Sequence, residues 1–139
     1  MDTCRFLVEV GANVVICKHS HCARCFETYR GAPIVYGKGN FLFDYPSKEP
    51  IWHEGVLVSL VINKDAETEV RFIPYMQSDG QPGVRRPPNE TAFLCDFNDR
   101  SRSIVDEAFV RDSGYTFAKK RSVIICTCSI IHQGYFAVR

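Results

Sequence analysis

The chain has 139 residues, 45% of them hydrophobic and 24% charged, a composition typical of a globular domain that can bury a core. Its formal net charge of +1 gives no broad electrostatic field, so nucleic acid is not expected as a partner. The longest apolar run, residues 123–131, is far shorter than the roughly 20 residues that cross a bilayer. The charged residues Asp2, Arg5 and Glu9 leave no uninterrupted apolar stretch near the N-terminus, which therefore does not resemble a signal peptide. As it stands, the chain is expected in the cytoplasm, without a membrane span.

The N-terminal segment predicts a short helix followed by a buried strand. Asp2 or Thr3 can cap the helix, and Gly11 stands where a left-handed helix end is expected. Residues 13–17 form a continuous apolar, β-branched run, which is typical of a strand covered on both faces. We therefore expect a central strand of an α/β sheet, followed by a loop at residues 18–21, where polar residues end the run.

Two antiparallel hairpins are expected next. Residues 25–29 and 33–36 predict two strands joined by a two-residue turn at Arg30 and Gly31. Residues 54–62 and 68–74 predict a second pair, with its turn at residues 63–65.

The C-terminal part predicts a loop and one helix. Residues 79–90 are rich in proline and glycine, which favours a surface loop. A cap at Asn98 or Asp99 predicts a helix over residues 100–111 that ends at residues 113–114. Its buried stripe would consist of Ile104, Val105, Ala108 and Phe109.

His19 and His21 are the candidate metal ligands. They are separated by one residue directly after the buried strand, and in an extended chain residues i and i+2 project to the same side. Ligands gather at the carboxyl end of strands in α/β sheets, and imidazole is a common metal ligand. Two ligands do not complete a catalytic centre, which normally takes three or more per metal.

Three sequence blocks that include this pair carry a family resemblance. They are residues 11–21, GANVVICKHSH, residues 26–36, FETYRGAPIVY, and residues 39–44, GNFLFD. In order and spacing they resemble the closing half of the CapA family, whose members are proteins of poly-gamma-glutamate and polysaccharide capsule synthesis in bacteria. Residues 54–60 and 70–74 also resemble strands that follow in that family.

The resemblance implies an α/β fold, namely the C-terminal portion of a calcineurin-like metallophosphoesterase sandwich, with mixed β-sheets flanked by helices. His19 and His21 stand at the two histidines of the Gly-His-x-His motif of such enzymes. The resemblance implies that they serve two different divalent ions, manganese, iron or zinc, whose bridging water is the nucleophile. This sequence has Lys18 where the motif has glycine, which would put a cation beside the metals.

The other metal motifs of the family would lie upstream of residue 1, so the resemblance implies a domain truncated at its N-terminus and an incomplete metal site. The expected division is residues 1–76 as the C-terminal half of the CapA-like domain, 77–98 as a loop region and 99–139 as a C-terminal helix and strand-like tail. The expected partner is the missing N-terminal half or another copy of the chain, and little or no hydrolase activity is expected of this chain alone. Full-length relatives are often membrane-anchored or extracellular.

Several other residues near these motifs are weaker site candidates. Asn40 and Lys18 are the substrate-binding candidates, although the Asn40 amide could equally orient a histidine or hold a tight turn. Asp44 is a further candidate, and Glu27 reads as a structural carboxylate. For Trp52 and His53 the expectation is a packing or surface role.

A cysteine-rich alternative accounts for the same segment. Cys17, His19, His21, Cys22 and Cys25 supply five sulfur and imidazole groups within nine positions. Such a cluster could hold a structural zinc in a non-enzymatic binding or interaction module. The cysteine variants of this cluster separate the two hypotheses, because only the zinc module depends on the thiols.

Overall fold

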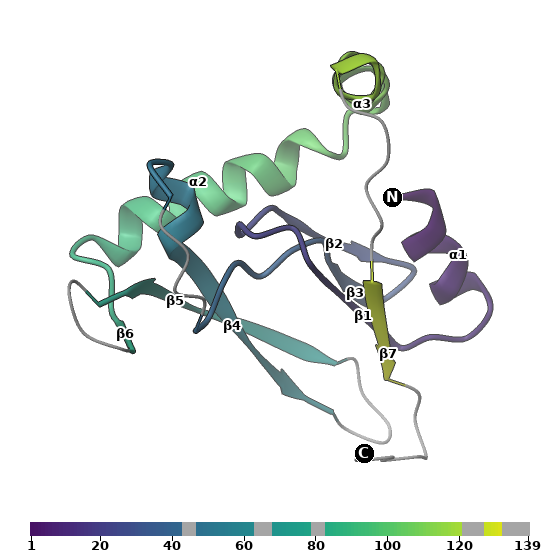
Figure 1. Ribbon diagram of the computed structural model, residues 1–139. Coiled ribbons are helices and arrows are strands. Elements are labelled where there is room, and N and C mark those ends of the chain that lie inside the picture. Colours follow the sequence, from purple (N-terminus) through teal and green to yellow (C-terminus); the bar gives the residue numbers. More distant parts are fainter. Residues whose placement is uncertain (43–46, 63–67, 79–82, 121–126, 132–139) are drawn as a thin grey trace.

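The computed structural model describes residues 1–42, 47–62, 68–78, 83–120 and 127–131, with the backbone alone from residue 114 onward. These residues form a mixed α/β structure with two β-sheets (Figure 1). The α/β class predicted from the sequence is confirmed. None of the helices in these ranges is both long and apolar enough to span a membrane.

The first sheet has four strands and contains the predicted buried strand at an inner position. Its order is β2 (Phe26–Tyr29), β3 (Ala32–Val35), β1 (Val14–Lys18) and β7 (Thr127–Ile131). Strand β1 runs parallel to β3 and antiparallel to β7. The central position expected for residues 13–17 is therefore confirmed. The apolar run of this segment is explained by its place in the sheet, because β1 has a neighbouring strand on each edge and is buried on both faces.

The hairpin of β2 and β3 has the turn that its sequence predicts. Arg30 and Gly31 both adopt positive φ angles, of 50° and 80°. This is the pattern of a type I′ turn, whose twist matches that of the flanking strands. The pairing places Tyr29 opposite Ala32 and Phe26 opposite Val35.

Helix α1 (Asp2–Glu9) packs beside this sheet and ends as the sequence predicts (Figure 1). Gly11 has φ of 111°, and the amides of Gly11 and Ala12 donate to the carbonyls of Val8 and Leu7. These two bonds form the Schellman motif, which satisfies the last carbonyls of a helix. The predicted cap is wrong, because the helix starts one residue earlier, at Asp2, and Met1 provides no side-chain cap.

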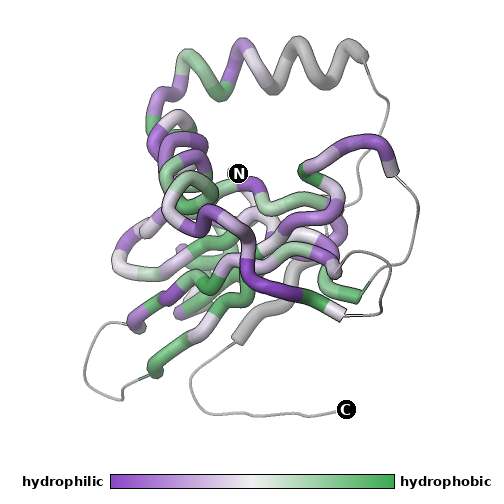
Figure 2. Tube along the Cα trace, turned by 90° about the vertical axis from the view of Figure 1, so that its left-hand side faces the viewer, coloured by the Kyte–Doolittle hydropathy of each residue, from purple (hydrophilic) through white to green (hydrophobic). Residues whose placement is uncertain are grey.

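The core lies between α1 and the first sheet. Cys4 and Ala12 from the helix and its end pack against Val15, Cys17 and Ile34 from the sheet. Figure 2 shows the hydrophobic residues concentrated along the strands in the middle of the molecule. This packing fixes the end of β1, from which the candidate histidines emerge.

The second sheet consists of β4 (Glu54–Val61), β5 (Glu69–Gln77) and β6 (Val84–Arg85). The predicted antiparallel hairpin of residues 54–62 and 68–74 is confirmed, while its turn at residues 63–65 lies outside the described residues. Strand β6 falls within the predicted loop of residues 79–90, so that prediction is wrong there. Its two residues pair with Met76 and Gln77. This pairing is possible because β5 continues to Gln77, beyond residue 74, where the predicted strand ended.

The helix prediction for residues 100–111 is wrong in its boundaries. The structure has two helices there, α2 (Glu90–Ser103) and α3 (Glu107–Lys120), so helix also replaces part of the predicted loop region 77–98 and continues through residues 113–114. The Asn89 side chain accepts from the Ala92 amide, which caps α2. The Asp106 carboxylate accepts from the amides of Ala108 and Phe109, so it caps α3 and separates the two helices.

The predicted buried stripe is wrong for the same reason. Val105 lies in the break between the helices and is 72% exposed, and Phe109 is 49% exposed. The beginning of α3 stands away from both sheets in the two views (Figures 1 and 2). The apolar residues of this segment therefore do not contribute to the core described above.

Helix α2 joins the two sheets through a cluster of phenylalanines. Phe97 is fully buried. It stacks on Phe26 of β2, with ring centroids 5.6 Å apart, and meets Phe72 of β5 edge to face at 5.0 Å. The Ser101 hydroxyl accepts from the Phe26 amide and donates to the Phe97 carbonyl. The group joins α2, β2 and β5, three elements far apart in the sequence, so α2 packs where β2 meets β5.

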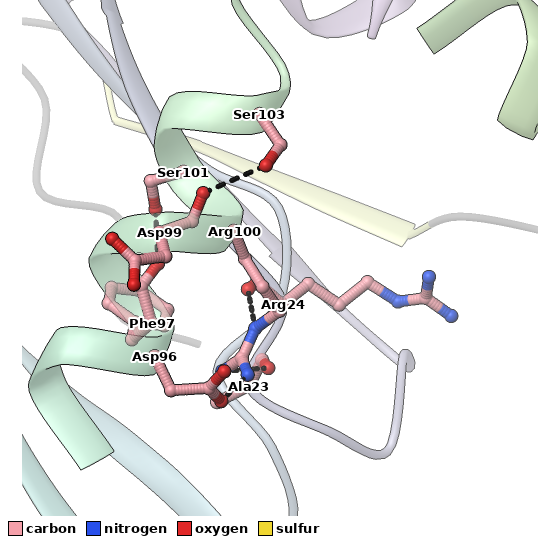
Figure 3. Close-up of polar contacts among 8 residues, drawn as sticks. All are labelled: Ala23, Arg24, Asp96, Phe97, Asp99, Arg100, Ser101 and Ser103. Atoms are coloured by element: carbon pink, nitrogen blue, oxygen red, sulfur yellow. Dashed lines mark hydrogen bonds and ion pairs between the residues drawn. The ribbon is translucent and has the colours of Figure 1, made fainter. Parts of the chain in front are cut away.

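A second contact of α2 is polar (Figure 3). The Arg100 guanidinium donates to the carbonyls of Arg24 and Ala23, at 2.8 and 3.3 Å, and pairs with Asp96 one helical turn earlier. The segment between the candidate histidines and β2 is thereby attached to the helix.

An ion pair attaches α1 to the first sheet. Arg5 donates to both carboxylate oxygens of Glu27, at 2.9 and 2.7 Å, and the Tyr36 hydroxyl donates to the same carboxylate. Burial raises the pKa of Glu27, but the bonds from Arg5 and Tyr36 outweigh it, so the pKa lies below its ordinary value of 4.5. Glu27 is thus a structural carboxylate, as its strand position suggested.

We expect Glu27→Gln to lower the free energy of unfolding at pH 7 by about 2 kcal/mol, less than for a fully buried pair because Arg5 is partly exposed. Since the folded-state pKa is depressed, this contribution is present above pH 4.5 and is lost as the pH falls through the folded-state value. Urea unfolding of wild type and variant at pH 7 and at decreasing acidic pH checks this. A difference that stays constant with pH would contradict it.

Candidate functional site

The candidate metal ligands lie in a short segment after β1, which we call the histidine loop, residues 19–22. His19 and His21 have φ angles of 73° and 56°, in the left-handed region that residues other than glycine rarely adopt. Their ring centroids lie 5.0 Å apart, with the ring planes inclined by 55°. The two rings therefore lie close together, as the sequence predicts. The backbone that brings them together is a tight turn with left-handed conformations at His19 and His21, and not an extended chain.

Close packing against residues 37–40 maintains the shape of the histidine loop. The Ser20 hydroxyl donates to the Cys22 carbonyl at 2.8 Å, and the Cys22 thiol donates to the Ser20 carbonyl at 3.3 Å. A Cβ atom added at Gly37 would collide with the Ser20 hydroxyl. Glycine at position 37 thus allows the loop to lie directly on the segment that carries Asn40.

Asn40 determines the orientation of the His21 ring. It is 7% exposed, and its side-chain nitrogen donates to the carbonyls of His21 and Trp52, at 3.2 and 3.0 Å. Carbonyl oxygens only accept, so the remaining atom of the amide, Oδ1, must be the one 2.8 Å from His21 Nδ1. His21 Nδ1 therefore carries the proton, and the neutral ring has its lone pair on Nε2.

This arrangement has the chemistry of an oriented metal ligand. Metal-binding histidines usually donate their second ring nitrogen to an oxygen acceptor, which fixes the tautomer and the direction of the ring. Of the roles that the sequence left open for Asn40, the geometry favours orienting His21, because three hydrogen bonds already use its amide. Lys18, the other substrate-binding candidate, is exposed at the end of β1 beside His19.

Trp52 is part of the site, although the sequence indicated only a packing or surface role. It lies in the short 3-10 helix η1 (Pro50–His53), and its ring stacks on His21 at 4.6 Å with an interplanar angle of 11°. The stack and the bond from Asn40 to its carbonyl hold Trp52 against the loop. No sequence signal linked positions 21 and 52, because the contact depends on how η1 enters β4.

His53 does not join the histidine pair. Its Nδ1 lies 2.7 Å from the Gln77 side-chain oxygen, and its Nε2 donates to the Ser47 carbonyl at 2.8 Å. Hydrogen bonds to Gln77 and to the Ser47 carbonyl raise the pKa of His53 above its ordinary value. The expectation of a role outside the site therefore agrees with the contacts that the ring makes.

Asp44, a further candidate from the sequence, lies outside the described residues.

The structure does not assemble the five-member cysteine and histidine cluster. Cys17 points into the core, where its sulfur lies 3.4 Å from that of Cys4, away from the exposed His19. Burial raises the pKa of the Cys25 thiol to about 11, which disfavours the thiolate form that binds metals. Across the described ranges, no three histidine, cysteine or acidic side chains are placed to hold one metal ion.

The described residues thus bring two imidazole rings together but assemble no third ligand beside them. A ring separation of 5.0 Å is compatible with both rings on one ion or with one ring on each of two neighbouring ions. A third ligand has to come from outside the described part of the chain.

Comparison with known proteins supports the family resemblance over the same segment. Residues 1–45 match the model of the family described as bacterial capsule synthesis protein PGA_cap. The match includes α1, the first three strands, the histidine loop and Asn40, so the resemblance drawn from the sequence blocks is confirmed there. Residues 54–60 and 70–74, where the resemblance was also seen, lie outside the match. No match was found among curated proteins.

Proposed function

We propose that this chain contributes the histidine half of a divalent metal centre in a metallophosphoesterase-like hydrolase of capsule synthesis. The observation that carries the proposal is the convergence of His19 and His21, with the Asn40 amide fixing the tautomer of His21. The capsule role rests on the family match over residues 1–45.

The contacts and exposure of three residues support the roles proposed for them. His21 would bind the metal through Nε2, because Asn40 holds the proton on Nδ1. His19, on the exposed side of the loop, would supply the second imidazole, and Lys18 would attract an anionic substrate group. Bound manganese, iron or zinc would supply an activated water or hydroxide to a phosphorus or acyl centre.

The remaining ligands would come from outside the described residues of this chain. The candidates are an N-terminal half of the domain, carried on a separate or longer chain, and a second copy of this chain. We therefore expect no metal-dependent hydrolysis of a simple aryl phosphate by the chain alone. A metal-dependent rate lost in His21→Ala would contradict this expectation and show that the chain completes the centre without a separate N-terminal half.

Zinc and manganese titration tests the proposed ligands. We expect His19→Ala and His21→Ala each to weaken binding at least tenfold, and Asn40→Ala to weaken it about ten- to a hundredfold, because an oriented ligand loses its second hydrogen bond. Isothermal titration at several protein concentrations, with metal content by mass spectrometry, measures this and detects binding shared between copies.

His53→Ala is the matched control, since it also removes one imidazole close to Trp52 but lies outside the pair. Equal loss of affinity in His53→Ala and His21→Ala would indicate non-specific binding to histidine and contradict the proposal. Affinity that is retained in the histidine variants but lost in Cys22→Ser would support the cysteine-based alternative.

A further inference from the structure

Two buried thiols lie in contact where α1 packs on β1. Cys4 on the helix and Cys17 on the strand are 4% and 0% exposed, and their sulfur atoms are 3.4 Å apart. The surrounding core residues are apolar. Neither thiol has a role in the metal site proposed above, because both point into the core and away from the histidine loop.

The arrangement is close to that of a disulfide. A disulfide holds its sulfur atoms about 2.05 Å apart, so the two sulfurs of this pair need to approach by about 1.3 Å. The two side chains come from different elements that face each other across the core. A small shift of the short helix α1 toward the strand would supply this approach.

We propose that Cys4 and Cys17 form a disulfide that locks α1 onto β1 under oxidising conditions. The oxidant is a small-molecule disulfide such as oxidised glutathione. One cysteine thiolate attacks it, forming a mixed disulfide and releasing one reduced thiol, and the second cysteine thiolate then displaces the other thiol. The two cysteines lose two electrons and two protons, and the oxidant is reduced to two thiols.

Access to the buried thiols requires α1 to open. The helix has only eight residues, too few to be stable alone, and Phe6 on its outer face is exposed. Its contact with the sheet depends on the core around Cys4 and on the ion pair from Arg5 to Glu27. The rate of disulfide formation should therefore follow the opening of α1, and Arg5→Ala should raise that rate by about tenfold or more.

Oxidation of the whole chain with glutathione disulfide, followed by alkylation, digestion and mass spectrometry, tests the proposal. We expect a peptide linking Cys4 to Cys17 as the main intramolecular product. The double variant Cys22→Ser, Cys25→Ser should give the same product in equal yield, whereas Cys4→Ser should abolish it. Dominant linkage of Cys22 to Cys25, or intermolecular linkage without the predicted peptide, would overturn the proposal.

The disulfide should also change stability. Closing a loop between positions 4 and 17 should raise the folding equilibrium constant by about a hundredfold, if the bond forms without strain. Urea unfolding of the oxidised and reduced Cys22→Ser, Cys25→Ser variant measures this difference. An oxidised protein that is less stable than the reduced one would show that the pair cannot join within the native fold and would overturn the proposal.

Discussion

Gly39→Ala is expected to destabilise the protein by at least about 3 kcal/mol, a large part of the 5–15 kcal/mol that holds a typical domain together. Gly39 has φ of 84°, a left-handed conformation that costs an L-residue roughly 1–2 kcal/mol. The larger part is steric. An added Cβ would lie within 3.0 Å of the Glu54 carbonyl oxygen and of the Gly55 Cα, and neither backbone atom can rotate away.

The reason for this crowding is that residues 37–40 cross the start of β4 at close range. Gly39 and Gly55 form an isolated β-bridge, and the Val56 amide donates to the Lys38 carbonyl at 2.8 Å. Asn40 follows directly, so displacement of this crossing would also move the amide that orients His21. We therefore expect the variant to lose metal affinity together with stability.

Urea unfolding and soluble yield measure the loss, with Gly83→Ala as the matched control. Gly83 also has a left-handed φ, of 133°, but among the described residues the nearest atom to an added Cβ is Ser78 Oγ at 4.0 Å. That variant should show only the conformational cost, about 1 kcal/mol. Equal effects of the two substitutions would show that the close approach of β4 to residue 39 does not contribute.

Phe97→Ala is expected to cost about 3–5 kcal/mol, the usual range for a fully buried phenylalanine. The ring packs against both Phe26 of β2 and Phe72 of β5, whose own ring centroids lie 4.6 Å apart. Its loss leaves a cavity where α2 joins the two sheets. The bond from the Phe26 amide to the Ser101 hydroxyl and the bond from Arg100 to the Arg24 carbonyl would weaken as well, because the same face of α2 makes both.

Phe93→Ala provides the comparison for this prediction. Phe93 lies one turn earlier on α2, stacks on Phe97 at 6.5 Å and is partly exposed, so its removal should cost about 1 kcal/mol. Thermal and urea unfolding of both variants measure the difference. A Phe97→Ala effect no larger than that of Phe93→Ala would mean that α2 is not the element that joins the sheets.

The boundaries of α2 and α3 show that capping residues in the sequence do not by themselves determine where a helix begins. Asn98 and Asp99 are acceptable caps, but Asn89 and Asp106 cap the helices that form. All four residues have the side chains that capping requires, so their identity does not select among them. Burial of Phe97 between the two sheets favours the helix that starts at Glu90, and this burial depends on residues 71 and 25 positions away.

The sequence by itself determined the features that depend on neighbouring residues. The apolar run of β1, the turn at Arg30 and Gly31, the helix end at Gly11 and the succession of hairpin strands all follow from local patterns. The sequence also indicated the histidine pair, since one residue separates its members. These features depend on residues that are close together in the sequence. The conformational preferences of such residues act regardless of where the segment lies in the folded protein.

Only the tertiary structure decided what each side chain meets. Three contacts join residues that are 13 to 31 positions apart. They are the stacking of Trp52 on His21, the hydrogen bond between Asn40 and the same ring, and the contact of Cys17 with Cys4. The two contacts of His21 depend on close approaches that glycines 37, 39 and 55 permit. The contact of the two cysteines depends on the packing of α1 against the first sheet. Such contacts form because the packed core allows one arrangement of the elements, and packing is a property of the whole chain that no local pattern contains.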